Sequence, residues 1–453
     1  MSPFEAPPPA RKPISVDNIQ GLLEEFGISS NGFLPEHLPL DILPDPYYVP
    51  WEYLMQNLNN FLDAETFRQH ADQLPILSLH RLVTYQEQQR AYVVLAFFAH
   101  AYIWGGDKAS ETLPPPISTP LLQISHHLNL PPVATYAALS LWNFRTTDPD
   151  DLTNLSAIHS LHTFTGTRDE SWFYAVSIAI EARGARTIPL LLHALHSASV
   201  HDYPAVTTAL HDLTQCITSL GDLLERMDEQ CDPNVFYHRI RPFLAGSKNM
   251  AAAGLPCGVF YDRGGGEGEW RQLRGGSNGQ SSLVQFFDGV LGVEHLHAAC
   301  GRGNGKEMTF HEEVRGYMPD GHRRFLEYIA EVFPGGLRRA LLEGGGHDGY
   351  DVRAVDGRLT CLGAYRAATD ALAALRGKHL QMVTRYIIIP SRQPLYPGGA
   401  VNLATASSKV GKAVGDQGHE VKMGQSQLTG TGGTALLPFL KQSRDETSRA
   451  GLI

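Results

Sequence analysis

A histidine stands in the middle of an apolar helical pattern near the C-terminal end of the sequence. Between Asp370 and Pro390, apolar side chains recur every three or four residues, and this spacing places them on one face of an α-helix. Pro390 is expected to end the helix, because proline has no N–H for the helical ladder. His379 lies on the apolar face. An imidazole there is either a hydrogen-bonded core residue or a ligand of a buried group, and the residues alone favour the first without excluding the second.

Arg241 is the second residue that could do chemistry. It belongs to a helical pattern at 233–246, which Asp232 or Pro233 would start and Gly246 would end, and it lies on the side of the apolar residues. A buried guanidinium needs an anionic partner, because unpaired burial of a charge is costly. The partner is either an acid of the protein itself or the carboxylate of a substrate, which arginine can hold with two parallel hydrogen bonds.

Other groupings of polar residues point less clearly to chemistry. The pairs His159/His162 and His193/His196 have helical spacing but lack the HExxH pattern of zinc enzymes, so surface or capping roles are expected. The glycine-rich stretch 301–307 has no Ser or Thr after its lysine and is not a phosphate loop. The stretch 275–282 is compatible with a linker that ends in a helix N-cap.

The elements that must position these residues are mainly helices. The chain has 453 residues, of which 43% are hydrophobic, enough for a large core. Helical spacing recurs while alternating strand patterns are scarce, so an all-α fold is predicted, with a smaller N-terminal domain at 1–160, including a flexible proline-rich leader, and a larger helical domain at 161–453. Besides 233–246 and 370–389, the predicted helices are 92–104, 133–144, 171–185 and 204–229.

Irregular segments interrupt the second half of the chain. Glycine-rich insertions at 264–268, 301–305 and 344–357 are expected to be surface loops. The longest irregular stretch is 391–434. A loop of this length in a globular domain is usually a lid or a disordered segment, and its position after the His379 helix predicts that it closes over the site.

Charge and cysteine usage restrict the environment and the partners. The net charge of −10 argues against nucleic acid and anionic membranes as partners. The five cysteines are odd in number and form no CxxC pair, which indicates reduced thiols without a disulfide framework or zinc site. The N-terminal stretch has no apolar core of a secretory signal, so we expect a cytoplasmic protein.

Several motifs resemble one enzyme family. The stretch RGKHLQMVTRYIIIP, 376–390, resembles the haem-ligand helix of the indoleamine 2,3-dioxygenases. Six further segments resemble the same family in the same order, and together they extend from about Leu130 to Lys441. They are LPPVATYAALSLWN, SWFYAVS, DPNVFYHRIRPFLAG, GGSNGQSS, QFFDGVLG and TGTGGTALLPFLK.

The resemblance implies a role for individual residues. His379 would be the axial ligand of haem iron, and Asp288 with Arg376 a charged pair at the edge of the haem that carries its propionates. Arg241 would bind the substrate carboxylate, and Thr431 would lie near its ammonium group. The other implied residues are Gly276, Ser277 and Asn278 in a loop between haem and substrate, Ser177 as the lone distal hydroxyl, and Tyr136, Phe173, Phe236 and Leu244 as the walls of an indole pocket.

The resemblance also implies a reaction. The family's haem b, with ferrous iron, uses O2 to convert L-tryptophan to N-formylkynurenine, the first step of the kynurenine pathway of tryptophan catabolism and NAD biosynthesis. Both oxygen atoms enter across the indole C2–C3 bond, and an electron donor keeps the iron ferrous. No segment offers an obvious distal histidine or carboxylate base, so the protein's task would be orientation and exclusion of water. A monomer is expected.

Some residues depart from familiar members of the family, and two other hypotheses stay open. The departures are Leu139, Ser140, Ser247, Asn278 and Gly377, and they concern substrate affinity and turnover more than the reaction class. One alternative is a haem-binding relative with little turnover that senses a ligand or signals. The other is a helical scaffold without a cofactor, which would be colourless.

Overall fold

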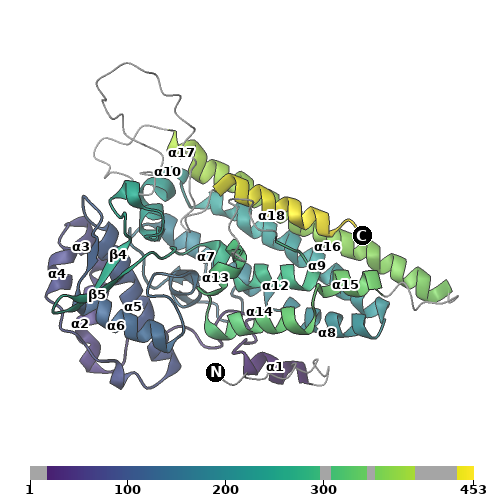
Figure 1. The fold of residues 1–453 in the computed structure, drawn as a ribbon, viewed down its shortest axis with the longest axis horizontal. Helices are drawn as coiled ribbons and strands as arrows, with labels where there is room; N and C mark the ends of the chain where they lie inside the picture. Colours follow the sequence, from purple (N-terminus) through teal and green to yellow (C-terminus); the bar gives the residue numbers. More distant parts are fainter. Residues whose placement is uncertain (1–17, 296–307, 344–351, 393–435) are drawn as a thin grey trace, which may run out of the picture.

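The computed structural model describes residues 18–295, 308–343, 352–392 and 436–453. The molecule is elongated, with a bundle of long helices over most of its length and a group of shorter helices at one end (Figure 1). None of the helices in these ranges is long and apolar enough to cross a membrane. The all-α class predicted from the sequence is confirmed, since the strands are few and short.

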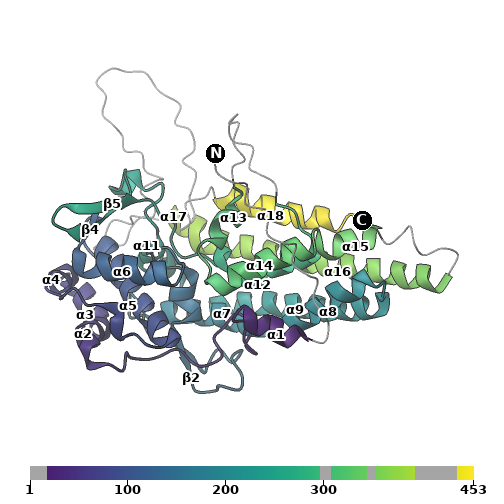
Figure 2. The same ribbon diagram turned by 60° about the horizontal axis from the view of Figure 1, so that its bottom comes forward.

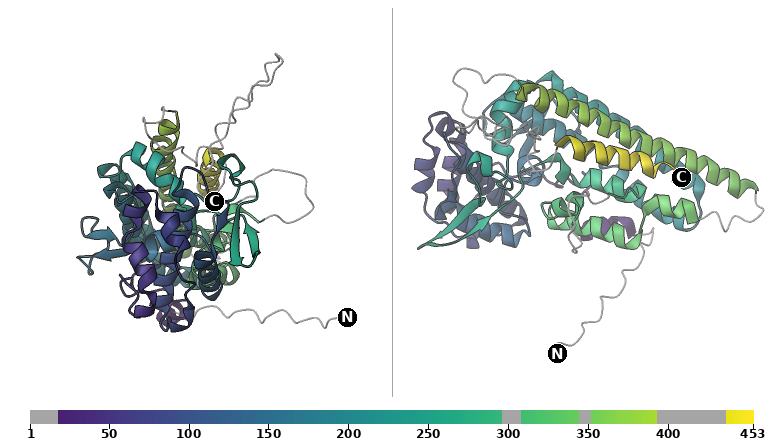
Figure 3. Two further views of the ribbon diagram at one scale, coloured as in Figure 1. Left: turned by 90° about the vertical axis from the view of Figure 1, so that its left-hand side faces the viewer. Right: turned by 45° about the horizontal axis from the view of Figure 1, so that its top comes forward.

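The long helices form the larger part of the molecule. α9 and α16 pack against each other over much of their length, and the C-terminal α18 lies along α16 (Figure 3). Even the first described helix, α1, lies beside α8 in this part (Figures 1 and 2). The helices are α1 (Ile19–Glu25), α7 (Arg168–Gly184), α8 (Thr187–Ser199), α9 (Tyr203–Glu225), α12 (Ser282–Leu291), α13 (Phe310–Arg315), α14 (Asp320–Val332), α15 (Gly336–Glu343), α16 (Val352–Val383) and α18 (Leu436–Ala450).

The shorter helices surround α5 (Tyr85–Trp104) at the other end. A capping box formed by Thr84 and Glu87 starts α5, and nearly all of its residues from Arg90 onward are buried, as predicted for 92–104. Inside this part, Arg90 pairs with Glu52 at 2.6 Å. Around α5 lie α2 (Val49–Gln56), α3 (Leu58–Asp63), α4 (Phe67–Asp72) and α6 (Pro115–His127).

The described strands are short and form two small sheets beside these helices. β4 (Val259–Gly264) pairs in parallel with β1 (Thr112–Leu113) and antiparallel with β5 (Glu267–Arg271), while β2 (Phe144–Thr146) pairs with β3 (Ile158–Ser160). The predicted domain boundary at residue 160 stays a prediction. The β1–β4 pair shows that one segment from the second part of the chain lies on the first.

Most predicted helices are present, with changes at their ends. Residues 171–185 belong to α7, and 204–229 form α9 and a 3₁₀ turn, Arg226–Glu229. Asp232 caps the helix at 233–246 by accepting hydrogen bonds from the backbone N–H groups of Asn234 and Val235, but the helix ends at Leu244 rather than Gly246. It consists of α10 (Pro233–Val235), a π-helix (Phe236–Ile240) and α11 (Arg241–Leu244).

The prediction of a continuous helix at 133–144 was wrong. Only a π-helix at Ala137–Leu141 forms, and Phe144 belongs to β2. The Tyr92 hydroxyl lies 2.9 and 2.8 Å from the carbonyl oxygens of Pro131 and Val133, and His100 Nε2 accepts a hydrogen bond from the Ala134 N–H at 3.0 Å. Side chains of α5 thus satisfy backbone groups that would otherwise enter a helical ladder.

Two predictions about the end of the His379 helix and the glycine-rich segments also needed correction. The helical segment does not end before Pro390. After α16 it continues as a π-helix (Thr384–Ile388) and then as α17 (Ile389–Ser391). Pro390 lies in the first turn of α17, where its missing N–H leaves no hydrogen bond unmade. Residues from Val352 onward, expected in a loop, belong to α16. The first insertion, 264–268, forms the β4–β5 turn and the start of β5. Residues 301–305, 344–351 and 393–434 lie outside the described residues.

Candidate active site

One cavity, at the junction between the shorter helices and the long bundle, brings together nearly all the residues that the sequence singled out. Ile180 and Leu375, which pack against both hydrophobic clusters of the core, lie on its wall. Its lining includes Tyr136, Phe173, Ser177, Phe236, Arg241, Leu244, Gly276, Ser277, Asn278, Asp288, Arg376 and His379. The remaining one, Thr431, lies outside the described residues. The shared cavity is an observation, whereas the individual roles stay predictions.

Two π-helical segments of the described chain contribute residues to the cavity wall, and a third begins directly after a wall residue. The first two are Phe236–Ile240 and Thr384–Ile388, and the third is Ala137–Leu141, which follows Tyr136. A π turn has one more residue than an α turn and shifts the side chains that follow it, and such turns are frequent at functional sites. The three-to-four spacing of the sequence does not show these extra residues, so their position was not predicted.

His379 projects into the cavity from α16. Burial lowers its pKa to about 4, and the nearby charge of Arg376 acts in the same direction. The imidazole is therefore neutral at pH 7, which is the form that binds a metal. In the described ranges, no three His, Cys, Asp or Glu side chains come together as a metal site.

Aromatic rings form one wall of the cavity. The ring centroids of Phe173 and Phe236 are 5.0 Å apart, and Tyr386 packs edge-on against Phe236 at 5.7 Å. The Tyr386 hydroxyl lies 2.9 Å from Asp228 Oδ1 and 2.8 Å from the Cys231 carbonyl oxygen, which fixes the ring. This wall suits a flat apolar ligand. Tyr386 lies in the predicted helix between Asp370 and Pro390, but the sequence analysis did not identify it as a site residue.

Arg241 provides a buried cation beside this wall. Its side chain is only 2% exposed, and its guanidinium carbon lies 5.6 Å from the centroid of the Tyr237 ring. Burial lowers the pKa of Arg241, whereas the nearby Tyr237 raises it. The guanidinium nevertheless stays protonated, as it does throughout proteins. Because Arg241 also lines the cavity, an anionic group can reach it from a largely apolar space.

The predicted pair of Asp288 and Arg376 lies at a polar end of the cavity. Arg376 Nη2 donates to both carboxylate oxygens of Asp288, at 2.8 and 2.7 Å. Burial alone would raise the pKa of Asp288, but the charges of Arg376 and His295 hold it well below its usual range. Arg376 also donates to Thr447 on α18, so the pair connects α12, α16 and α18.

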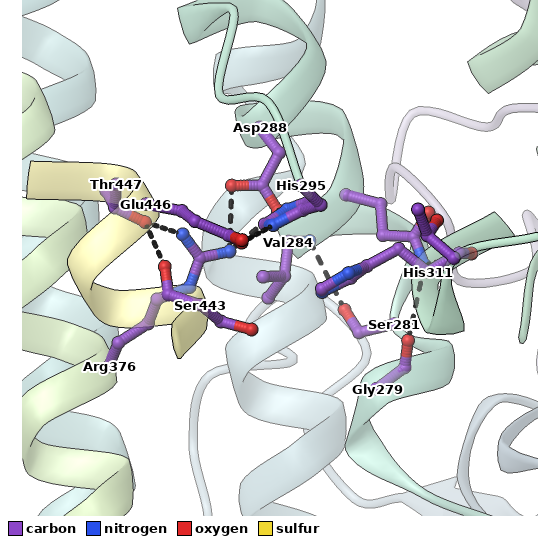
Figure 4. Close-up of polar contacts among 12 residues, drawn as sticks. Gly279, Ser281, Val284, Asp288, His295, His311, Arg376, Ser443, Glu446 and Thr447 are labelled. Carbon is purple, nitrogen blue, oxygen red and sulfur yellow. Dashed lines mark hydrogen bonds and ion pairs between the residues drawn. The ribbon is translucent and has the colours of Figure 1, made fainter. Parts of the chain in front are cut away.

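Two histidines at this polar end were missed by the sequence analysis. His295 Nε2 is 3.2 Å from Asp288 Oδ2, and its Nδ1 is 2.7 Å from Glu446 Oε2. The ring of His311 stacks on His295 with centroids 3.6 Å apart and planes 14° apart (Figure 4). In the sequence the two histidines are 16 residues apart, and neither lies within a motif that the sequence analysis used. Only the tertiary structure brings them together.

A buried acid behind Tyr136 was also missed. Glu181 is 1% exposed, and its Oε1 accepts hydrogen bonds from the hydroxyls of Tyr136 at 3.1 Å and Ser281 at 2.6 Å. Burial raises its pKa to about 7. It lies one helical turn after Ser177, on the buried side of α7, and this position of an acid in an apolar pattern was a signal that could have revealed it. Glu181 is not among the residues that line the cavity, but its partners Tyr136 and Ser281 are.

Two of the residues that depart from familiar family members, Leu139 and Ser247, have clear local contacts. A Cβ added at Gly276 would come within 2.4 Å of Leu139 Cδ1, so the bulk of Leu139 is accommodated by the glycine beside it. Ser247 Oγ donates to the Arg271 carbonyl oxygen and accepts from the Leu273 N–H, both at 3.1 Å. At Gly377, an added Cβ would meet no atom within 4 Å, so packing does not require glycine there.

The chain was compared with known proteins. The family model described as "Indoleamine 2,3-dioxygenase" matches residues 22–450. Indoleamine 2,3-dioxygenase nanC of Aspergillus nanangensis is 41% identical over 449 residues, covering 97% of this chain and 98% of the relative. The indoleamine 2,3-dioxygenase of Saccharomyces cerevisiae is 39% identical over 439 residues, with 94% and 93% covered. The 6-hydroxytryptophan 2,3-dioxygenase fscD of Fusarium equiseti is 34% identical over 432 residues, with 95% and 98% covered.

Proposed function

Since the chain belongs to the indoleamine 2,3-dioxygenase family, we propose that it converts L-tryptophan and O2 to N-formylkynurenine, at the start of the kynurenine pathway. Membership makes it an oxidoreductase that adds O2 to a tryptophan-type substrate. The choice of L-tryptophan is part of the proposal, because one relative is named for 6-hydroxytryptophan. The observation that carries the proposal is the single cavity in which neutral His379, buried Arg241 and the aromatic wall come together.

The cavity fits the haem on which this family depends. His379 would hold the iron of haem b, and the Asp288–Arg376 pair would face the carboxylate-bearing edge. The loop of Gly276, Ser277 and Asn278 lines the same space. Bound haem, kept ferrous by an electron donor, would supply the activation of O2.

The chain's own residues would bind and orient the substrate. Tyr136, Phe173, Phe236 and Leu244 provide an apolar pocket for the indole, and Arg241 provides the fork for its carboxylate. A role for Thr431 at the substrate ammonium is part of the same proposal. Holding the indole C2–C3 bond in a dry cavity where O2 is bound gives the positioning that the reaction needs.

No described side chain is placed as a strong base on the cavity wall beside the substrate pocket. The Ser177 hydroxyl lines the cavity and donates to the carbonyl oxygen of Phe173 at 3.3 Å, and a serine hydroxyl is a weak base. Glu181 lies behind Tyr136. The proposed mechanism therefore relies on orientation and exclusion of water, with no proton transfer to a protein base.

The test is the visible spectrum of the purified protein together with product formation. The wild-type protein should show a Soret band and release N-formylkynurenine from tryptophan and O2. The His379→Ala variant should lose most of its haem, because the other polar contacts cannot replace the bond to iron. Unchanged haem content and an unchanged coordination spectrum in this variant would refute the assignment of His379. Haem binding without steady-state product would instead indicate a relative that senses or signals.

A further inference from the structure

The polar end of the cavity contains a stacked histidine pair that the proposed reaction does not use. His311, in α13, lines the cavity, while His295 lies behind it and follows α12. Figure 4 shows the two rings next to each other, with Asp288 and Glu446 beside His295. Their centroids are 3.6 Å apart, so the charge on one ring directly affects the other.

His295 carries the positive charge of the pair. Both of its nitrogens face carboxylate oxygens, Asp288 Oδ2 at 3.2 Å and Glu446 Oε2 at 2.7 Å. Ionised carboxylates only accept hydrogen bonds, so both nitrogens must donate, and an imidazole with two donors is an imidazolium. With Arg376, the cluster contains two cations and two anions, which balance.

His311 is thereby kept neutral. Burial and the adjacent positive charge of His295 lower its pKa to about 3. A neutral imidazole still has one N–H to donate. In the described part of the chain, no other side chain forms a hydrogen bond with this ring. The side chain of Gln285 bonds instead to the backbone carbonyl oxygen of His311, at 3.3 Å.

The hydrogen-bonding capacity left at this end consists mainly of donors. The Asp288 carboxylate is already occupied by Arg376 and His295. Ser443, which lines the same end, has a hydroxyl that can donate, and the ring of His311 has its N–H. A group that only accepts hydrogen bonds, such as a carboxylate, matches these donors.

We propose that His311 donates a hydrogen bond to a ligand carboxylate at this end of the cavity, with His295 as the positioning residue that fixes the His311 ring. The inference rests on the proposed function, because the carboxylate would come from the cofactor or from the substrate. These sources share one chemistry, and the experiment separates them.

The experiment measures how firmly the full-length protein holds haem and haem dimethyl ester, which has no free carboxylates. Each is reconstituted into wild type, His311→Leu and His311→Gln, and its loss to excess apomyoglobin is followed in the Soret band. The Leu variant should lose haem about tenfold faster or more, as expected for a hydrogen bond to a charged group, and the ester at nearly the wild-type rate. The Gln variant keeps an N–H and should recover most of the difference. His193→Leu, on an exposed part of α8, is the matched control.

Each outcome decides the proposal. Equal acceleration of haem and ester loss in His311→Leu would mean that the ring is only a packing element, and the proposal would be overturned. Unchanged haem loss combined with a raised KM for tryptophan but not for tryptamine would identify the substrate carboxylate as the ligand. Unchanged haem loss and an unchanged KM would also overturn it. A wild-type protein that takes up no haem would overturn both this inference and the proposed function.

Discussion

Arg241 is a buried cation beside the aromatic wall of the cavity, and it is the proposed binding partner of the substrate carboxylate. Removing it should lower kcat/KM for tryptophan by about ten- to several hundredfold, the cost of losing charge-assisted hydrogen bonds in a dry site. Arg241→Lys should restore only part of this, because an ammonium keeps the charge but not the fork. Steady-state kinetics of the Ala and Lys variants, with the haem spectrum recorded in parallel, measure both effects.

Tryptamine, which lacks the carboxylate, is the control for Arg241. Wild type should use it poorly, and Arg241→Ala should reduce its turnover little further. If the Ala variant impaired tryptamine as much as tryptophan, or lost its haem, the guanidinium would be a structural residue and the substrate orientation would be wrong.

Removing the Ser177 hydroxyl should have only a small effect on catalytic activity. It already donates to the Phe173 carbonyl oxygen within its own helix, and a hydroxyl is a poor base near neutral pH. Ser177→Ala should therefore keep substantial activity, within about tenfold of wild type. General-base catalysis contributes about a hundredfold or more, so a loss of that size, with haem and substrate affinity intact, would contradict a mechanism without a base.

Individual residues differed in how far the sequence could reveal them. His379 and Arg241 stand out because each is a polar residue on the apolar face of one helix, a local property. His295 and Glu446 are 151 residues apart, and Glu181 and Ser281 are 100 apart. Which side chains meet across such separations depends on how the helices pack, and helix periodicity does not specify this.

At the scale of elements, Glu181 joins three of them. It lies on α7 and accepts two hydrogen bonds from other elements. One comes from the Tyr136 hydroxyl at the start of the neighbouring π-helix, and the other from the Ser281 hydroxyl at the N-cap of α12. Burial raises its pKa to about 7, so the folded protein holds this proton more tightly than the unfolded chain. Stability is therefore lost as pH rises from the unfolded pKa through 7, by up to about 3 kcal/mol.

Glu181→Gln should remove this pH dependence, because the amide oxygen still accepts from both hydroxyls but cannot ionise. Urea unfolding at pH 5 and pH 8 measures it: the stability difference between the two pH values should be smaller in the Gln variant than in wild type. Glu25→Gln, an exposed acid, should leave the difference unchanged. The same difference in Glu181→Gln and wild type would show that the carboxyl has an ordinary pKa.

Helices were more predictable than the irregularities within them. Long helices such as α7 and α9 can be predicted from the three-to-four spacing of their apolar residues. The segment 133–144 has the same spacing but is not a continuous helix, because Tyr92 and His100 of α5 bond its backbone. Such competition between side chains and backbone is a tertiary effect, and it shaped the cavity wall around Tyr136.

At the scale of the whole molecule, α18 closes one side of the cavity. Leu436, Phe439, Leu440 and Ser443 line it. Further along the helix, the Ala450 carbonyl oxygen accepts from the Tyr365 hydroxyl at 3.3 Å and from Arg338 Nε at 3.2 Å. Between these regions, Glu446 and Thr447 contact His295 and Arg376. The charged cluster at the polar end therefore also holds the last helix in place.

This attachment of α18 should depend on pH through His295. Burial alone would lower the pKa of His295, but Asp288 and Glu446 raise it, against the opposing charge of Arg376; the neighbouring His311 is neutral. A raised pKa means that the stabilisation is complete below about 6.5 and is lost as pH rises through the folded pKa. Deprotonation leaves His295 one donor for two carboxylates, so α18 should loosen at alkaline pH.

Hydrogen exchange of α18 peptides, compared between wild type and His295→Gln at each pH, tests this, because intrinsic exchange rates cancel in the ratio. At pH 6 wild type should be clearly better protected than the variant. By pH 9 the two should converge, since neutral histidine and glutamine both lack the charge. A difference in protection that stays constant from pH 6 to 9 would mean that His295 holds α18 by shape alone. Convergence confined to α18 and α13, with α8 unaffected, would place the effect at the polar end of the cavity and not in the fold as a whole.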